Sequence, residues 1–318
     1  MKKFLESLKT ELQKLNVNSL GIEEIINDHR DMIESAIQTG LNEDEIISKF
    51  GDPKNLASEL AEQEPKKTDD DSGSEDEMVL RKLFKGVDDK IKVFTELTFE
   101  NITYQVSKDE DIHVFSKGLK NMDQYTVEFE NNTLTLKGPR ERIFGLINFG
   151  KKSGSIVVKI PNKQKVESLY NSGINSDVNL KGLTIESLTL KTINGKIMIE
   201  DAVCDQGKWH TVNGDVHVKS VKGGKLRSSQ VSGDVSIQDV KLEGTLELDS
   251  VSGAIMIEDS TCARCDVKSV SGSLKGKEFY PLKLALRTVS GNILIENTLD
   301  KKIDVISKKS LSGDINIK

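Results

Sequence analysis

Two cysteines have a spacing that could carry chemistry. Cys262 and Cys265 are separated by two residues, which is the spacing of a thiol–disulfide redox pair and of one half of a zinc site. A closed zinc site needs about four ligands, and the chain holds only one further cysteine, Cys204. Buried core thiols are the favoured interpretation, and a redox pair and a metal site are the alternatives.

Histidines and glycine-rich loops give no second candidate. His29, His113, His210 and His217 are scattered, and their spacing is not that of a catalytic triad or a metal site. The glycines do not cluster into a phosphate-binding or dinucleotide-binding fingerprint. The sequence therefore predicts a protein that is not an enzyme, with no catalytic, cofactor-binding or metal-ligating residues and no cofactor.

A repeat in the second half of the chain must position these residues. Seven segments align on a glycine: TINGKIMI, TVNGDVHV, QVSGDVSI, SVSGAIMI, SVSGSLKG, TVSGNILI and SLSGDINI. GINSDVNL is a degenerate earlier copy with Ser176 in the glycine position. The aligned positions are 176, 195, 214, 233, 253, 272, 291 and 313, so the copies recur every 19 to 22 residues. Such a period indicates a repeat architecture.

Apolar residues alternate with polar ones around each glycine, as on a strand with one buried face. We expect the residues two and four positions after the glycine to point inward. We expect the same of the residues two positions before it: Ile193, Val212, Val231, Val251, Val270, Val289 and Leu311. A second alternating pair follows 12 and 14 positions after the glycine: Leu188 and Leu190, Leu284 and Leu286, Ile303 and Val305. Each repeat therefore offers two short strands.

The period selects the architecture. About 19 residues are too few for the four strands of a propeller blade and suit one coil of a parallel β-solenoid, with a propeller or sandwich as the alternative. Coils stack about 4.8 Å apart, so eight of them span roughly 38 Å. The glycine permits a bend or a close backbone approach. The residues before it should form a polar ladder on the outside: Asn194, Asn213, Ser232, Ser252, Ser271 and Ser290.

The solenoid also places the cysteines and the tryptophan. Cys204 and Cys262 lie three coils apart, about 14 Å, which exceeds the roughly 7 Å limit for a disulfide. Cys265 and Trp209 occupy inward positions. A core role is therefore favoured for both, and for Trp209 it is favoured over stacking on a carbohydrate.

Acidic residues follow the glycine in several copies, at Asp215, Asp234 and Asp314. Calcium-binding solenoids use Gly-Gly-x-Gly-x-Asp turns, which this sequence lacks, so a solvated strand edge is the favoured interpretation. The nearly constant coil spacing leaves no room for the long loops of β-helix enzymes that act on polysaccharides. The hypothesis that the chain is such a β-helix enzyme is accordingly disfavoured.

Residues 1–63 are predicted to form a small all-α helical bundle. A first helix presents one apolar face made of Phe4, Leu5, Leu8, Leu12 and Leu15. A second run from Ile22 to Ile37 contains His29, which we interpret as structural, and ends at Gly40. Asn42 caps a third helix, and Asp52 with Pro53 opens a fourth. The apolar residues expected in these last two helices are Ile46, Ile47, Phe50, Leu56 and Leu60.

Composition separates this bundle from the repeat. The chain has 318 residues and a formal net charge of −6. Residues 64–78 contain an acidic stretch typical of a flexible linker. The rest, 79–318, is the predicted solenoid domain: residues 79–170 supply opening coils and a cap, and residues 171–318 the regular repeats. With 5% aromatic residues and many branched aliphatic ones, the composition is that of a mainly β protein.

Several of these motifs resemble known families. The segments DDKIKVF, NNTLTLKG and GSIVVKIP and the serial V-[NS]-G-[DN]-[IV] strands resemble the bacterial β-strand-repeat "putative adhesin" family over about residues 88–318. The segments FLESLKTELQKL and EIISKFGDPKNLASEL resemble the small helical HAAS signalling domain. The combination is similar to the LiaX-like envelope-stress proteins of Gram-positive bacteria. This resemblance implies a role in sensing envelope damage and antimicrobial peptides, and it brings no catalytic residues.

These observations favour a non-enzymatic envelope-stress sensor or regulator that acts by binding a partner or envelope ligand through its solenoid. The alternative is an adhesin or envelope-binding protein without a signalling role. Expected partners are a protein, such as a membrane-bound sensor or regulator, and an anionic envelope surface, because the solenoid region is modestly basic. No nucleic-acid partner is expected. Without a visible signal peptide or transmembrane helix, the predicted location is the cytoplasm, with the cell surface by non-classical export as the alternative.

Overall fold

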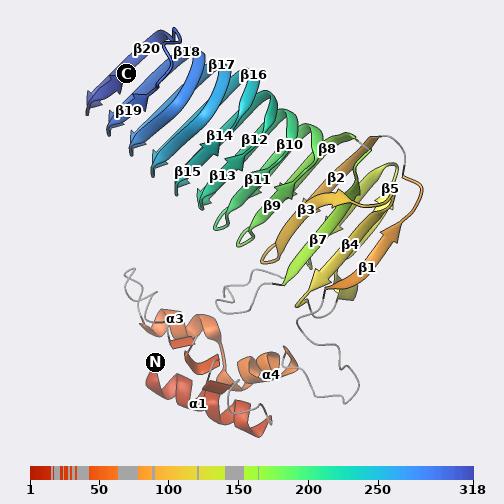
Figure 1. Cartoon of the computed structure of the whole chain (residues 1–318). Coiled ribbons are helices and arrows are strands. Elements are labelled where there is room, and N and C mark those ends of the chain that lie inside the picture. The colour runs from red at the N-terminus through yellow and green to blue at the C-terminus, as the bar shows by residue number, and fades with distance from the viewer. Residues whose placement is uncertain are drawn as a thin grey trace. The chain divides into compact units, whose positions relative to one another are not determined.

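The computed structural model describes residues 1–15, 17, 22–23, 25–27, 29–30, 33, 43–63, 78–87, 90–119, 122–139, 154–163 and 165–318 (Figure 1). The described residues form two compact units, one holding the helices and the other holding the strands. Among them, no helix has both the length and the apolar character that a bilayer span requires.

The helical unit contains α1 (Lys2–Lys14), α3 (Glu43–Phe50) and α4 (Pro53–Gln63). The Asp52 carboxylate accepts a hydrogen bond from the Lys54 amide at 2.8 Å, so it caps α4 as its sequence predicts. The apolar face of α1 packs into a core made of Phe4, Leu5, Leu8, Leu12, Ile22, Ile26, Ile33, Phe50, Leu56 and Ala57. Leu15 is exposed, against expectation, because α1 ends one residue before it. Ile37, Gly40 and Asn42 lie outside the described residues.

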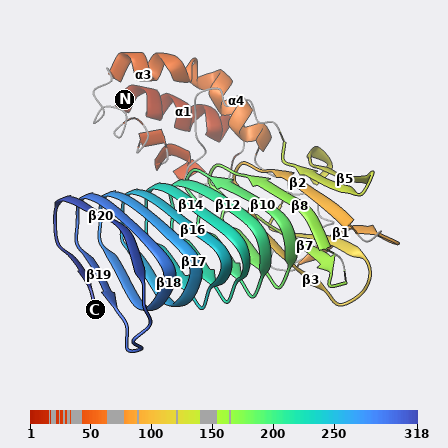
Figure 2. The same ribbon diagram turned by 90° about the horizontal axis from the view of Figure 1, so that it is seen from above.

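The predicted parallel β-solenoid is confirmed, and its coils stack along one axis (Figures 1 and 2). Each coil pairs in parallel with its copies on either side; Val216, for example, faces Ile197 in one neighbouring coil and Val235 in the other. The propeller and the sandwich are excluded by this pairing. The short strands are β9 (Val178–Lys181), β11 (Ile197–Glu200), β13 (Val216–Lys219), β15 (Val235–Gln238), β19 (Ile293–Glu296) and β21 (Ile315–Ile317).

The second strand of each coil is long, where the sequence suggested a short one. These strands are β8 (Lys165–Ser172), β10 (Thr184–Thr192), β12 (Val203–Asn213), β14 (Lys222–Ser232), β16 (Lys241–Ser252) and β20 (Asp304–Ser312). In two coils the short and long strands are continuous, as β17 (Ile255–Ser271) and β18 (Leu274–Ser290). Three turn residues between a short and a long strand, Asp201, Ser220 and Asp239, have positive φ, which allows the sharp change of direction there.

The coil that comes first in the sequence, made of β2 (Lys90–Glu96) and β3 (Asn101–Ser107), does not lie at the end of the stack. β2 lies between β6 (Thr133–Lys137) and β8, and β3 lies between β7 (Ser155–Pro161) and β9, all in parallel. Antiparallel strands complete this end: β4 (Ile112–Lys117) pairs with β1 (Val79–Phe84) and β7, and β5 (Thr126–Glu130) pairs with β6. A short 3-10 helix, η1, spans Met122–Gln124.

The interior is a continuous stack of aliphatic side chains. The residues two positions after the glycine are buried as predicted: Ile197, Val216, Val235, Ile255, Leu274, Ile293 and Ile315. Leu188, Leu190, Leu284 and Leu286 are also buried, as expected for the second alternating pair. Val305 is exposed instead, because the pairing of β18 with β20 shifts register directly after Leu284 and Val305.

One predicted inward row faces outward. The residues two positions before the glycine are exposed, and in five of them the exposed fraction is 41–47%: Ile193, Val231, Val251, Val270 and Val289. Leu311 is also exposed and Val212 is half-buried. The chain turns a corner at the glycine, so the alternation of the short strand does not continue through it. The neighbouring residue three positions before the glycine, such as Thr192 or Thr211, points inward instead.

Candidate functional site

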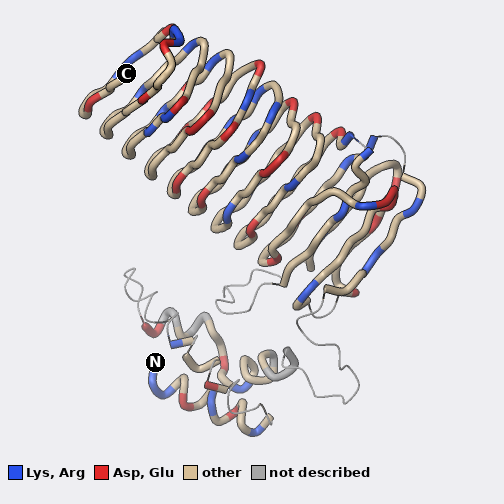
Figure 3. The backbone as a smooth tube through the Cα atoms, in the orientation of Figure 1, with Lys and Arg blue, Asp and Glu red and all other residues tan. Residues whose placement is uncertain are grey.

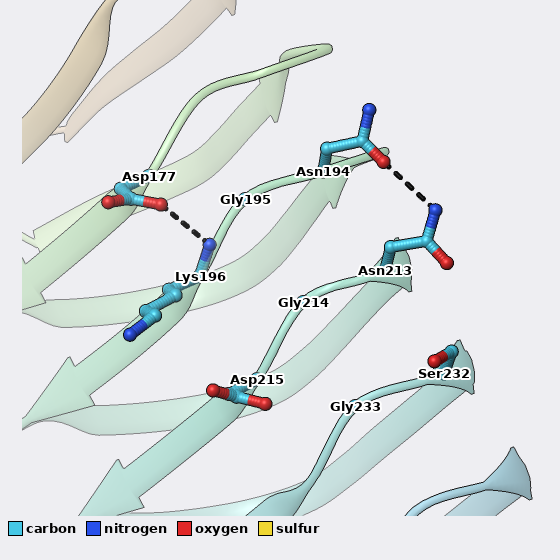
Figure 4. A pocket seen from close by; sticks show the side chains of 9 residues that line it. All are labelled: Asp177, Asn194, Gly195, Lys196, Asn213, Gly214, Asp215, Ser232 and Gly233. Carbon is cyan, nitrogen blue, oxygen red and sulfur yellow. Dashed lines mark hydrogen bonds between the residues drawn. The ribbon is translucent and has the colours of Figure 1, made fainter. Parts of the chain in front are cut away.

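The glycine corner is the tightest contact between coils. A Cβ atom added at Gly214 would lie 2.0 Å from the carbonyl oxygen of Gly195, and one at Gly253 would lie 2.1 Å from that of Gly233. Only glycine therefore permits this approach, as the sequence suggested. Because glycine has no side chain, the row of glycines leaves a shallow hollow of about 360 Å³ (Figure 4). Its lining residues are Asp177, Asn194, Gly195, Lys196, Asn213, Gly214, Asp215, Ser232 and Gly233.

The predicted polar ladder forms one rim of this hollow. The Asn213 side-chain amide donates to the Asn194 carbonyl oxygen at 3.0 Å, and Asn194 donates to Asn175 at 2.8 Å (Figure 4). In later coils serine takes this position, and the Ser252 hydroxyl donates to the Val231 carbonyl at 3.4 Å. These amides and hydroxyls bond to adjacent coils, so the ladder holds the coils together.

The acidic residues after the glycine also have a structural task, which corrects their interpretation as merely solvated. The Asp177 carboxylate accepts a hydrogen bond from the Lys196 backbone amide at 2.8 Å (Figure 4). Asp215 accepts from the Asp234 amide at 3.1 Å, and Asp234 accepts from the Ala254 amide at 2.7 Å. The carboxylate of one coil thus satisfies an amide of the next coil at the corner. Asp314 lies in the last described coil, where its amide donates to Asn292.

A row of buried polar side chains lies behind the corner, and sequence reasoning missed it. Its members are Thr192, Thr211, Gln230, Ser250, Ser269 and Thr288. The Thr192 hydroxyl donates to the Ser176 carbonyl at 3.1 Å, and the Gln230 amide donates to the Gly233 carbonyl at 3.0 Å. The recurrence of small polar residues three positions before the glycine was the signal that could have found it. Together these hydrogen bonds stabilise the backbone at the glycine corner.

The unexpectedly exposed aliphatic residues form a surface feature of their own. We call them the aliphatic stripe: Ile174, Ile193, Val212, Val231, Val251, Val270, Val289 and Leu311. One such residue stands in every coil, two positions before the glycine, or before Ser176 in the first copy. With coils about 4.8 Å apart, the stripe runs for about 34 Å. Burial does not explain a row that is aliphatic in every coil and exposed in most.

Charged residues beside the stripe make the outer side of the long strands basic. Three columns of residues, in register from β10 to β20, form this basic face. Figure 3 marks the basic and acidic residues along the coils. It holds nine basic residues: Lys191, Lys208, Lys225, Arg227, Arg264, Lys268, Lys283, Arg287 and Lys309. It holds four acidic residues: Glu247, Asp249, Asp266 and Asp304.

The outer side of the short strands has a different character. In the same coils, from Lys196 to Lys318, it holds five basic residues against six acidic ones. The basic residues are Lys196, Lys219, Lys275, Lys277 and Lys318. The acidic residues are Glu200, Asp215, Asp234, Glu258, Glu296 and Asp314. The basic face with its aliphatic stripe is therefore the candidate functional site, and the short strands provide the comparison.

The cysteines lie inside the solenoid. Cys204, Cys262 and Cys265 are all buried and free of disulfides. Burial raises the pKa of Cys204 to about 12. A hydrogen bond with the Cys262 thiol, together with burial, raises the pKa of Cys265 well above its ordinary value. The Cys204 and Cys265 thiols are therefore protonated at neutral pH and weakly nucleophilic. Trp209 is buried, as its inward position predicts.

The histidines are dispersed as well. His29 is buried in the helical unit, where its Nδ1 lies 2.7 Å from the Ile25 carbonyl oxygen. His113 Nε2 lies 2.8 Å from an Asp109 carboxylate oxygen, and this hydrogen bond is the main reason that the pKa of Asp109 falls to about 2. His210 and His217 lie on the outer sides of β12 and β13. Within the described residues, no three His, Cys, Asp or Glu side chains are grouped to hold a metal ion.

Several solved structures are similar to this chain over about three quarters of its length. A "putative adhesin" from Bacteroides fragilis is 21% identical, covers 76% of this chain and 97% of its own, and has a TM-score of 0.43. A "putative adhesin" from Parabacteroides distasonis is 14% identical, with 75% and 97% covered and a TM-score of 0.43. A "putative lipid binding protein" from the same species is 17% identical, with 76% and 97% covered and a TM-score of 0.42. Comparison with curated protein sequences gives no match.

Family models account for both units of the chain. The HAAS model matches residues 3–59, which contain the described helix α3 and most of α1 and α4. The Toastrack DUF4097 model matches residues 89–243 and 210–318, which together contain the described strands from β2 to β21. The chain therefore belongs to the Toastrack DUF4097 family and carries a HAAS domain at its N-terminal side.

Proposed function

We propose that the protein is a non-enzymatic binding protein of the bacterial cell envelope. In this proposal the solenoid recognises an envelope ligand or partner, and the HAAS domain passes that event to a protein partner as part of an envelope-stress response. The aliphatic stripe carries the proposal, because it is aliphatic in every repeat and exposed in most of them. Repeated apolar side chains beside a basic face are suited to extended partners.

Two features support a binding role over catalysis. The polar groups at the glycine corner bond to neighbouring coils, so they hold the solenoid together and do not converge on a reacting group. Cys262 and Cys265, which have the one spacing suggestive of chemistry, are both buried, and the pKa of Cys265 is raised by the Cys262 thiol and by burial. The joining of HAAS and Toastrack domains in one chain supports the hypothesis of an envelope-stress sensor.

Fractionation of the native cells with protease shaving tests this function, before and after treatment with an envelope-targeting peptide. We expect the protein in the envelope fraction or exposed to the protease, with an amount or location that changes under stress. A protein that stays in the cytosolic fraction and is indifferent to the peptide would contradict the proposal.

An adhesin or envelope-binding protein without signalling is the second candidate. The observation that favours it is that the whole candidate site lies within the solenoid. It predicts that deleting the gene reduces attachment or envelope binding and leaves the transcriptional response to envelope stress intact. The sensor predicts a changed stress response in the same deletion strain.

A further inference from the structure

The aliphatic stripe and the basic face are parts of one continuous surface. Both lie on the outward side of the long strands, and the stripe residue follows the third charged column by two positions in each coil. Val231, for example, follows Ser229 and Arg227 on β14. The surface therefore presents a straight aliphatic row with cations along one side of it.

The acidic residues in the middle of this surface are neutralised by their neighbours. Glu247 lies 2.6 Å from Lys225, and Asp249 lies 2.9 Å from Arg227. Asp266 lies 2.8 Å from Arg264. Lys208, Lys283, Arg287 and Lys309 are exposed, and none of them pairs with a carboxylate of the described residues. The surface as a whole is consequently positive toward solvent.

We propose that this surface docks on an anionic lipid bilayer. The exposed lysines and arginines contact headgroup phosphates, and the aliphatic stripe enters the boundary between headgroups and acyl chains. The inference rests on the proposed function, in which the solenoid binds an envelope ligand, and it names that ligand as the lipid surface. It assigns the binding residues to one of the two outward sides.

The shape of the surface favours a bilayer over other anionic partners. A soluble polyanion would pair with the cations and leave the aliphatic stripe in water. A protein partner is usually anchored by aromatic or arginine side chains seated in pockets. The three charged columns and the stripe from β10 to β20 contain no Phe, Tyr or Trp, and two of their three arginines, Arg227 and Arg264, are already paired with carboxylates of the same surface. A straight row about 34 Å long is instead matched to a planar and fluid apolar medium.

Sedimentation of the full-length protein with vesicles tests the proposal. The vesicles contain phosphatidylcholine alone or phosphatidylcholine with phosphatidylglycerol. We expect binding to the anionic vesicles only, weakened by salt. The triple change Val231→Thr, Val251→Thr and Val270→Thr keeps the β-branched shape and removes apolar surface. It should weaken binding at least tenfold. Changing Lys208, Arg287 and Lys309 to Gln should weaken it about a hundredfold, at about fivefold for each cation.

The matched control changes three lysines on the other outward side. Lys219→Gln, Lys275→Gln and Lys277→Gln remove the same charge from the short strands and should leave vesicle binding within twofold of the wild type. Unfolding temperatures of all three variants verify that each one is folded.

Three results would overturn the proposal. The first is no binding to anionic vesicles at low salt. The second is equal loss in the control variant, which would indicate an unspecific charge effect. The third is binding that ignores the valine changes and is matched by soluble poly(glycerol phosphate), which would assign the surface to a polyanion. If vesicles do not bind while the native protein still fractionates with the envelope, the proposed function stands and only the lipid assignment fails.

Discussion

The two outward sides of the solenoid share one backbone and one period, yet their side chains differ. On the long strands, the position two before the glycine is aliphatic in every coil. On the short strands, the outward position three after the glycine varies freely: Met198, His217, Ser236, Met256, Lys275, Leu294 and Asn316. Folding therefore tolerates many residues at an outward position. Retention of one residue type at such a position points to a task of the surface.

The largest change in unfolding free energy is expected for a substitution inside the coil, and a much smaller one for the same substitution on the aliphatic stripe. Val235→Asp places a carboxylate in the solenoid core, where Val235 is 2% exposed, and should cost more than about 4 kcal/mol of unfolding free energy. Val231→Asp, four residues earlier on the stripe, should cost about 1 kcal/mol or less. Thermal unfolding followed by circular dichroism measures both. Equal destabilisation would mean that the stripe is structural.

The next effect concerns the glycine corner that separates the two sides. Gly214→Ala should cost more than about 2 kcal/mol, because the new Cβ atom meets a backbone carbonyl at 2.0 Å that cannot move without disturbing the preceding coil. Gly276→Ala is the matched change, since its Cβ atom meets only Ile295 side-chain atoms, the nearest at 3.1 Å. It should cost less than about 1 kcal/mol. Urea unfolding compares the two, and a Gly214→Ala protein as stable as Gly276→Ala would contradict the close approach.

The smallest effect is a pH dependence of folding stability that arises from the buried Cys204 thiol. Burial raises the pKa of Cys204 from 9.0 in a free thiol to about 12. Below pH 9 the thiol is protonated in both the folded and the unfolded chain, and its full contribution to stability is present. Between about pH 9 and pH 12 only the unfolded chain loses the proton, so stability falls by up to about 1.4 kcal/mol for each pH unit.

Urea unfolding at about pH 8 and about pH 10.5 checks this, with Cys204→Ala as the control. The variant keeps Tyr104 and Cys265, whose pKa values are also raised by their surroundings, and should lose only the part of the slope due to Cys204. Identical slopes in both proteins would place the Cys204 thiol in contact with solvent.

Sequence periodicity predicted the solenoid, the inward residues after the glycine and the polar ladder, and the Asp52-Pro53 pair predicted the cap of α4. It failed at the corner, because alternation holds along a strand and not through a bend, so Val231 and its copies face outward. It also could not show that β2 lies between β6 and β8, since that order depends on pairings between distant segments. The basic face emerges only once the long strands are in register, although its lysines are visible in the sequence.

A matched pair of labels shows which outward side of the solenoid meets the membrane. Val251 and Met256 are 45% and 42% exposed and lie on opposite sides of the Gly253 corner. Because the three natural cysteines are buried, Val251→Cys or Met256→Cys can be labelled selectively with an environment-sensitive fluorophore. With phosphatidylglycerol vesicles, we expect a blue shift and protection from an aqueous quencher at position 251 and no change at position 256. Equal responses at both positions, or a response at position 256 alone, would contradict docking through the aliphatic stripe.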